Sequence, residues 1–236
     1  MDKSRAAFDV THNVSGTVLY PLPLGKGHRL LGKANGFVNA IVGGWNLQGL
    51  TRWSTGAPYS ISSGRFPNGG GLGTTNVPES AMLRNMSMSQ FQSQLGVFKT
   101  PTGVFFINPN SGLITINGVA SRPVLCKPGQ TTPCFDFPAA GQFGNTPFNG
   151  WNGPNIVNQD LSVIKRTNIP KMGEHFNFEI RLEAFNAFNH PSFQPPPAGN
   201  TSLLSTSFGQ LTSVVDTVRG GGVNSRVVQW AVRVNF

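Results

Sequence analysis

Residues 174–188, EHFNFEIRLEAFNAF, are the stretch of this chain that indicates its fold class most clearly. Polar and apolar side chains alternate along it, and a period of two is typical of a β-strand with two unlike faces. From residue 175 to residue 184, every charge falls on one face. The polar and apolar sets are, in order, His175, Asn177, Glu179, Arg181 and Glu183, and Phe176, Phe178, Ile180, Leu182 and Ala184.

The last residues of the chain, 225–236, repeat this pattern. The apolar and polar sets there are, in order, Val228, Trp230, Val232, Val234 and Phe236, and Val227, Gln229, Ala231, Arg233 and Asn235. A strand tilted by about 45° needs roughly 9–11 residues to cross a lipid bilayer. Both stretches are long enough, so each is predicted to be a membrane-spanning strand.

Three weaker alternating stretches are also predicted to be strands, at about 12–20, 45–55 and 157–166. Long segments rich in Gly, Pro and Asn, about 57–155 and 189–224, separate some of the strands, and a short turn separates others. Short turns that alternate with long outer loops are typical of outer-membrane barrels. The predicted fold class is therefore all-β: an antiparallel meander that forms the C-terminal strands of a transmembrane β-barrel. Five strands cannot close a hydrated barrel, so further strands are expected upstream.

Composition and charge agree with this class. Charged residues are 11% of the chain, against roughly 25% in ordinary soluble domains. The net charge of +9 is scattered without a Lys/Arg run, which favours a solvated or pore-lining role over nucleic-acid binding. No stretch has the length and apolarity of a transmembrane helix, although a short helix at 36–42 is expected. Residues 1–10 do not resemble a signal peptide, so the start of an exported protein is expected to be missing.

The candidate site residues are polar groups predicted to face the lumen: Arg52, Asp160, Glu179, Arg181, Glu183 and Arg233. Two nearby carboxylates are also what a glycosidase would need, but ion pairing in a charged lumen is the interpretation favoured here. No catalytic residue is predicted. The histidines show no metal-ligand spacing, and neither a metal nor a cofactor is expected.

The end of the chain has a second predicted role. An aromatic last residue on an alternating strand looks like the signal read by the barrel assembly machinery, since an exposed strand can add to a template sheet. The residues of this signal are Trp230, Val232, Val234 and Phe236. The alternative is an ordinary terminal core strand.

Two further features concern aromatic residues and cysteines. Tyr20, Trp45 and Trp53 fall near the ends of the predicted lipid faces, as in an aromatic girdle, although packing inside a β-sandwich is an alternative. Cys126 and Cys134 are the only cysteines and lie in a Pro/Gly-rich loop. A disulfide that closes this loop is predicted for an oxidising compartment, with free thiols as the alternative.

Several motifs resemble the C-terminal barrel portion of Oar-like TonB-dependent receptors, which are also described as carboxypeptidase-regulatory-like-domain proteins. The motifs are FDVTHN at 8–13, YPLPLGKG at 20–27, GGWNLQG at 43–49, STGAPY at 54–59, FGN at 143–145, NQDLS at 158–162, RLEAFNAFNHP at 181–191, FGQLTS at 208–213 and SRVVQWAVRVNF at 225–236. The chain departs from the family at 148–154, FNGWNGP, where the family has Arg-rich sequences. We expect none of the family's signal peptide, regulatory-like domain, TonB box and plug within these 236 residues.

The resemblance implies energy-coupled uptake or surface binding of an unknown ligand at the outer membrane of a Gram-negative bacterium. The implied partners are outer-membrane lipid, the assembly machinery at the last strand, and the TonB complex through upstream regions. Two alternatives are a structural or adhesive surface protein and a soluble β-sandwich binding module. An outer-membrane enzyme is the least favoured.

Overall fold

A computed structural model describes residues 4–64, 80–108, 114–116, 119–121, 134–139, 142–169, 176–216 and 224–236 of the 236-residue chain. The chain divides into two compact units. The unit called here the sheet unit comprises Asn13–Trp53, Ile156–Ser192 and Val214–Phe236, and the loop unit comprises Met1–His12, Ser54–Asn155 and Phe193–Ser213. Each unit is described by itself.

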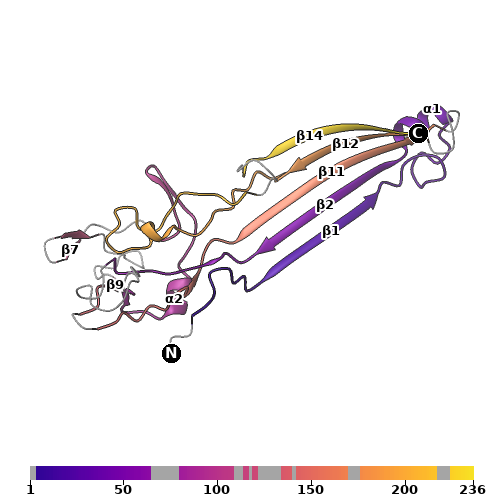
Figure 1. Cartoon of the computed structure of the whole chain (residues 1–236). Helices are drawn as coiled ribbons and strands as arrows, with labels where there is room; N and C mark the ends of the chain where they lie inside the picture. The colour runs from indigo at the N-terminus through magenta and orange to yellow at the C-terminus, as the bar shows by residue number, and fades with distance from the viewer. Residues whose placement is uncertain are drawn as a thin grey trace. The chain divides into compact units, whose positions relative to one another are not determined.

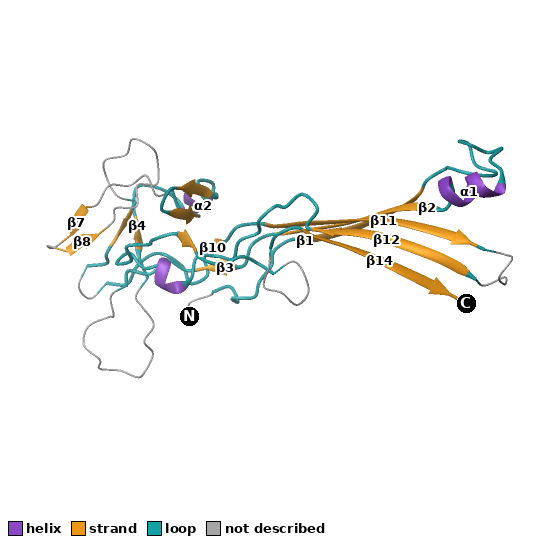
Figure 2. Cartoon of the chain, turned by 90° about the horizontal axis from the view of Figure 1, so that it is seen from above, coloured by secondary structure: helices purple, strands orange, loops and turns teal. Residues whose placement is uncertain are grey.

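The sheet unit holds one five-stranded sheet with the strand order β1-β2-β11-β12-β14. Its strands lie side by side in a single open layer (Figures 1 and 2). The bounds are β1 Asn13–Pro21, β2 Trp45–Ser54, β11 Ile156–Asn168, β12 Asn177–Phe185 and β14 Val227–Asn235. Neighbours in the sheet follow one another in the chain, apart from the short strands of the loop unit. The predicted antiparallel meander is therefore confirmed.

The strand registers show which residues share a face of the sheet. Ile180 is paired with Lys165 of β11 and with Val232 of β14, while Glu179 is paired with Arg166 and Arg233. Paired residues of an antiparallel sheet lie on the same face. The predicted separation into an apolar and a polar face therefore holds across β12 and β14.

The strand bounds differ from the sequence prediction most clearly at β11 and β12. β11 runs from Ile156 to Asn168 instead of 157–166, and β12 runs from Asn177 to Phe185 instead of 174–188. The early end of β12 has a geometric reason, because Asn186 has a φ of 46° and Asn189 a φ of 52°. Left-handed residues turn the chain out of the extended conformation.

The connector between β1 and β2, residues 22–44, contains α1 (Gly36–Val42), a helix at the residues where the sequence predicts one. Asn35 caps its first turn by accepting a hydrogen bond from the Val38 amide. Gly44, with a φ of 74°, leads into β2, and a Cβ there would lie 2.1 Å from the carbonyl oxygen of Arg166. Only glycine fits this close approach between β2 and β11.

The loop unit contains most of the two segments predicted to be long loops, 57–155 and 189–224, and its described residues form more regular structure than that prediction. Its short strands are β3 Pro58–Tyr59, β4 Met82–Leu83, β5 Phe98–Thr100, β6 Gly103–Phe105, β7 Ile114–Ile116, β8 Val119–Ser121, β9 Phe135–Asp136, β10 Trp151–Asn152 and β13 Gln210–Leu211. The described residues of this unit also form the helix α2 (Met88–Gln92) and the 3₁₀ helix η2 (Ala198–Asn200). Strands of two or three residues are too short to produce a readable alternation.

A hydrophobic core built on aromatic residues holds the loop unit together. Trp151 is 1% exposed and packs edge-on against Phe91 and Phe135, with ring centroids 5.4 and 6.0 Å away. Phe135 in turn lies 6.4 Å from the ring of Phe208, which comes from the second segment. Such aromatic pairs stabilise beyond the area that they bury. The two segments therefore fold onto a common core.

Within the described residues, no helix has the length and apolarity needed to cross a membrane.

Candidate functional site

The polar face of the sheet is organised around Glu179 on β12. This carboxylate is 1% exposed and accepts two hydrogen bonds on Oε2 from Arg166 of β11, at 3.1 Å from Nε and 2.6 Å from Nη2. Its other oxygen, Oε1, accepts a hydrogen bond from Nε of Arg181. A buried carboxylate requires such pairing, because an uncompensated buried charge is costly. Glu179 is therefore a fixed ion-pair centre between two neighbouring strands.

The remaining predicted lumen residues divide into those near this centre and those apart from it. Arg233 is the register partner of Glu179 on β14, and Glu183 accepts a hydrogen bond from Nε2 of Gln229 at 2.7 Å. Asp160 instead accepts a hydrogen bond from the Asn186 amide, at the other end of β12, and Arg52 lies exposed on β2. The sheet thus groups three of the six predicted residues, Glu179, Arg181 and Arg233.

Arg166 is the member of this centre that sequence reasoning missed. It lies at the last residue of the predicted strand 157–166, and its face follows from the alternation already visible in Asp160 and Ser162. Its partner depends on the register between β11 and β12, in which Arg166 opposes Glu179. Alternation alone does not determine the register between two strands. The sequence therefore indicates the face on which Arg166 lies but not its pairing with Glu179.

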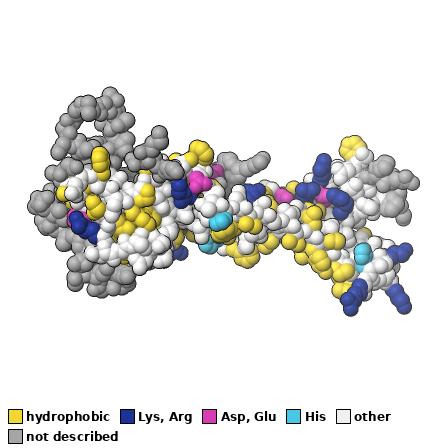
Figure 3. Space-filling view, turned by 90° about the horizontal axis from the view of Figure 1, so that it is seen from below, with side chains coloured by type: hydrophobic (Ala, Val, Ile, Leu, Met, Phe, Trp, Pro, Cys, Tyr) yellow, Lys and Arg dark blue, Asp and Glu magenta, His cyan; other side chains and the backbone are white. Residues whose placement is uncertain are grey.

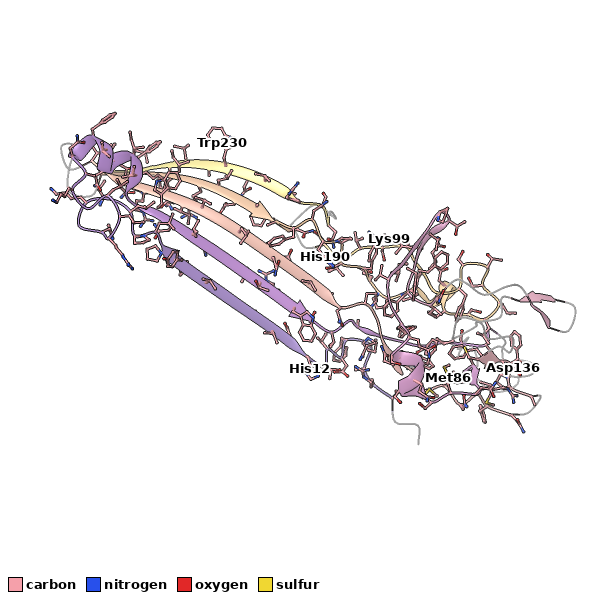
Figure 4. The ribbon with its side chains drawn as sticks, turned by 180° about the vertical axis from the view of Figure 1, so that it is seen from behind. His12, Met86, Lys99, Asp136, His190 and Trp230 are labelled. Carbon is pink, nitrogen blue, oxygen red and sulfur yellow. The ribbon has the colours of Figure 1, made fainter. Side chains whose placement is uncertain are left out.

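The opposite face of the sheet is apolar and exposed. Trp230 on the edge strand β14 is 74% exposed and projects away from the sheet (Figure 4). Exposed apolar side chains run along the sheet in Figure 3. They include Val14, Val18, Tyr20, Leu47, Leu161, Ile180, Leu182, Val228, Val232 and Val234. An apolar surface of this extent is unusual in water and typical of a protein that contacts lipid or a partner.

Lys165 is the exception on the apolar face. Its register partner is Ile180, yet its side chain is buried, and Nζ donates to the carbonyl of Gly43 at 2.6 Å and to Thr167 Oγ1 at 2.8 Å. The ammonium also lies 5.8 Å from the centre of the Trp45 ring. The ammonium thus reaches the carbonyl at the end of α1, where the dipole of a helix favours a positive charge.

At the far end of β12, Asn186 joins three strands. Its backbone amide donates to Asp160 Oδ1 of β11 at 2.9 Å, and its side-chain Nδ2 donates to the carbonyl of Asn224, just before β14, at 2.6 Å. Asn189 Oδ1 accepts from the Arg226 amide at 3.0 Å. Asn tolerates the left-handed conformation that this turn needs. The motif RLEAFNAFNHP therefore contains a turn that ties the strand ends together.

Asn224 and Ser192 extend this network. Asn224 Nδ2 donates to the carbonyls of Ser192 and Val215, at 2.9 and 2.5 Å, and Ser192 Oγ donates to the carbonyl of Val157 at 3.0 Å. Both side chains are buried. Buried polar groups with satisfied hydrogen bonds specify one conformation. Sequence reasoning did not single out either residue, since an isolated Asn or Ser in a loop has no periodic signal.

The loop unit contains a pocket of about 280 Å³. Its lining combines hydroxyl and amide groups, such as Ser60 and Asn149, with the rings of Tyr59 and Phe148, and it includes no Lys, Arg, His, Asp or Glu. The Tyr59 hydroxyl is buried and has no hydrogen-bond partner among the described residues. Burial raises the pKa of Tyr59, so this hydroxyl stays protonated.

Two predictions concern sulfur and metals. Cys134 is buried and disulfide-bonded. Cys126, the predicted partner, lies outside the described residues, so the pairing stays a prediction. Among the described residues, no cluster of three or more His, Cys, Asp or Glu side chains has a geometry suited to a metal ion.

An antiparallel meander with one lipid-compatible face, one charged face and long connections defines the class of outer-membrane β-barrel proteins. The comparison with protein families agrees with this class. The chain belongs to the outer membrane beta barrel domain family, whose model matches residues 1–229. Its location is the bacterial outer membrane. No curated protein and no solved structure matches the chain.

Proposed function

We propose that this chain forms part of the wall and outer surface of a TonB-dependent receptor that binds a ligand outside the cell and imports it. The observation that carries this proposal is the ion-pair centre at Glu179, on the sheet face opposite the apolar one. A hydrated lumen needs fixed polar groups, whereas a lipid-facing surface excludes them. The motifs that resemble Oar-like receptors support the narrower assignment to TonB-dependent receptors.

The polar face fits the interior of a large barrel. Five strands are too few to enclose water, so the lumen requires further strands paired to the free edges of β1 and β14. In such a wall, Arg166, Arg181 and Arg233 would give the lumen a positive lining around a single buried carboxylate. The Arg side chains are then available to a plug or to a passing anionic group.

The loop unit supplies the candidate ligand surface. Its segments follow β2 and β12, at the strand ends opposite the C-terminus, which would be the outer side of the membrane. Binding loops on a rigid scaffold commonly carry ligand specificity. The pocket beside Tyr59 has no ionisable group other than this phenol, which favours an uncharged polar part of the ligand.

The proposed partners follow from the same arrangement. Outer-membrane lipid would cover the apolar face, and the barrel assembly machinery would recognise β14 and Phe236. The TonB complex would act through a plug encoded upstream. We propose no enzymatic activity and no cofactor, and we place the predicted assembly residues Trp230, Val232, Val234 and Phe236 at the edge where assembly would begin.

The reading frame upstream of the Met1 codon tests the receptor assignment. A plug domain and a TonB box in the same frame, together with ligand uptake that stops in a strain lacking TonB, would support transport. A frame with barrel strands but no plug would instead support a structural or adhesive surface protein. That alternative rests on the loop unit, whose exposed surface would then serve for adhesion.

Membrane fractionation tests whether the chain is part of a membrane β-barrel at all. The protein should sediment with outer membranes and change its gel mobility on heating. Recovery of the chain as a soluble monomer with a cooperative melt would contradict the barrel and favour a soluble β-sandwich module.

A further inference from the structure

The connector between β1 and β2, residues 22–44, differs in composition from the rest of the sheet unit. It contains three cations, Lys26, Arg29 and Lys33, and no Asp or Glu. All three cations are exposed. Lys and Arg side chains gather at the end of the sheet that carries this connector (Figure 3). The connector therefore presents a positive surface.

The same connector exposes large apolar side chains. Phe37 is 78% exposed, and Leu31 and Ile41 are 57% and 56% exposed. Phe37 and Ile41 are four residues apart in α1, so they lie on one side of the helix. No residue of α1 is buried. A seven-residue helix without a buried face is not explained by packing within the sheet unit.

The connector is nevertheless held in a defined conformation. Asn39 Oδ1 accepts a hydrogen bond from the Lys26 amide at 2.6 Å, which ties the start of the connector to α1. Lys165 Nζ donates to the carbonyl of Gly43, and Thr167 Oγ1 donates to the carbonyl of Ala40 at 3.3 Å. These polar contacts fix α1 against β11, and its apolar side chains remain outside the contact.

The position of the connector continues the lipid-facing surface. Trp45 follows directly after it, on the same face as Lys165, and donates from its indole nitrogen to the carbonyl of Ile41 at 3.0 Å. Tyr20 precedes it and is exposed. Trp and Tyr are enriched at the boundary between lipid and water. The connector thus begins where the apolar face of the sheet ends.

We propose that residues 22–44 are an interfacial anchor that inserts Leu31, Phe37 and Ile41 into the inner leaflet of the outer membrane while Lys26, Arg29 and Lys33 bind phospholipid phosphates. A helix with apolar residues on one side and cations nearby lies in the plane of the interface. Anionic headgroups attract such cations. This anchor rests on the proposed membrane wall, since it needs the sheet to span the bilayer with α1 on the inner side.

Spin labels on the full chain, refolded into phosphatidylglycerol-containing vesicles, test the anchor. The labelled variants are Phe37→Cys in α1, Val232→Cys on the apolar face of β14 and Ser89→Cys in α2 of the loop unit as an aqueous control. Labelling without reductant spares Cys134, which is disulfide-bonded. The Phe37 and Val232 labels should meet oxygen more than a water-soluble nickel complex, and the Ser89 label should show the reverse.

Two outcomes overturn the anchor and are distinguishable from each other. A Phe37 label in water with a Val232 label in lipid would contradict the anchor and agree with the membrane wall. Labels in water at both positions would contradict the membrane wall as well. A lipid-exposed Phe37 label supports the anchor.

A charge variant tests the role of the cations. Arg29→Gln combined with Lys33→Gln should move the Phe37 label toward water in phosphatidylglycerol vesicles and leave it unchanged in phosphatidylcholine vesicles. Arg84→Gln combined with Lys99→Gln removes the same charge from the loop unit and should have no effect. Equal responses to the two double variants would overturn the phosphate contacts.

Discussion

The two units of this chain differ in whether their large apolar side chains are buried or exposed. In the loop unit, Trp151 is buried to 1% exposure among other aromatic rings. In the sheet unit, Trp230 is 74% exposed, whereas polar side chains such as Glu179 and Asn186 are buried. The hydrophobic effect places apolar groups away from water, so the exposed face of the sheet implies a nonaqueous surrounding. The difference between the units therefore marks which part lies in lipid.

The largest effect is expected from a pair of tryptophan variants. Trp151→Ala should destabilise the loop unit by about 3–5 kcal/mol, because it removes the centre of an aromatic core. Hydrogen exchange at the Phe106 amide, which is bonded to the Gly209 carbonyl, would report this loss. Trp230→Ala is the matched control and should leave that amide protected. Equal loss of protection in both variants would contradict the division of the chain into two separate units.

A charge on the apolar face gives the second effect. Val232→Arg should destabilise the membrane-inserted sheet by roughly 2–4 kcal/mol, because Arg at mid-depth is costly in lipid. Gln229→Arg places the same side chain on the polar face beside Glu183 and should cost little. Urea unfolding in vesicles, followed by tryptophan fluorescence, measures both. A reversed order would mean that the faces have been exchanged.

Much of the sheet could be predicted from sequence because its two faces differ so strongly. All five long strands and α1 follow from alternation and local composition. The loop unit could not be predicted, since β3, β4, β9, β10 and β13 have only two residues each. The burial of Glu179 and the pairing with Arg166 depend on register, which periodicity does not determine. Lys165 looks misplaced in sequence, because its contact with Gly43 depends on the fold of the connector.

The turn at residues 186–189, after β12, provides a third, smaller effect. Asn186→Ala should cost roughly 2 kcal/mol, since it removes buried hydrogen bonds and puts alanine at a positive φ. Asn186→Gly loses the same hydrogen bonds without backbone strain and should be about 1 kcal/mol less harmful. Hydrogen exchange at the Arg226 amide, bonded to Asn189, would follow the turn. If Gly proves the worse substitution, strain is not part of the role of Asn186.

The ion-pair centre gives the smallest effect. Glu179→Gln should cost about 1 kcal/mol, because the side chains of Arg166 and Arg181 are 56% and 37% exposed and solvent screens much of the interaction. The loss should shrink at high salt if water fills the lumen. Glu183→Gln, which removes the carboxylate facing Gln229, is the control and should cost less. A salt-independent loss at Glu179 would indicate a dry surrounding instead.

If one face of the sheet contacts lipid and the other contacts water, the exposure of β14 must alternate from residue to residue. Spin labels on single cysteines, placed in turn at residues 228–234 in vesicles, measure this exposure. We expect a period of two: lipid exposure at 228, 230, 232 and 234, and water exposure at 229, 231 and 233. Uniform water exposure along the strand, or a period other than two, would contradict it.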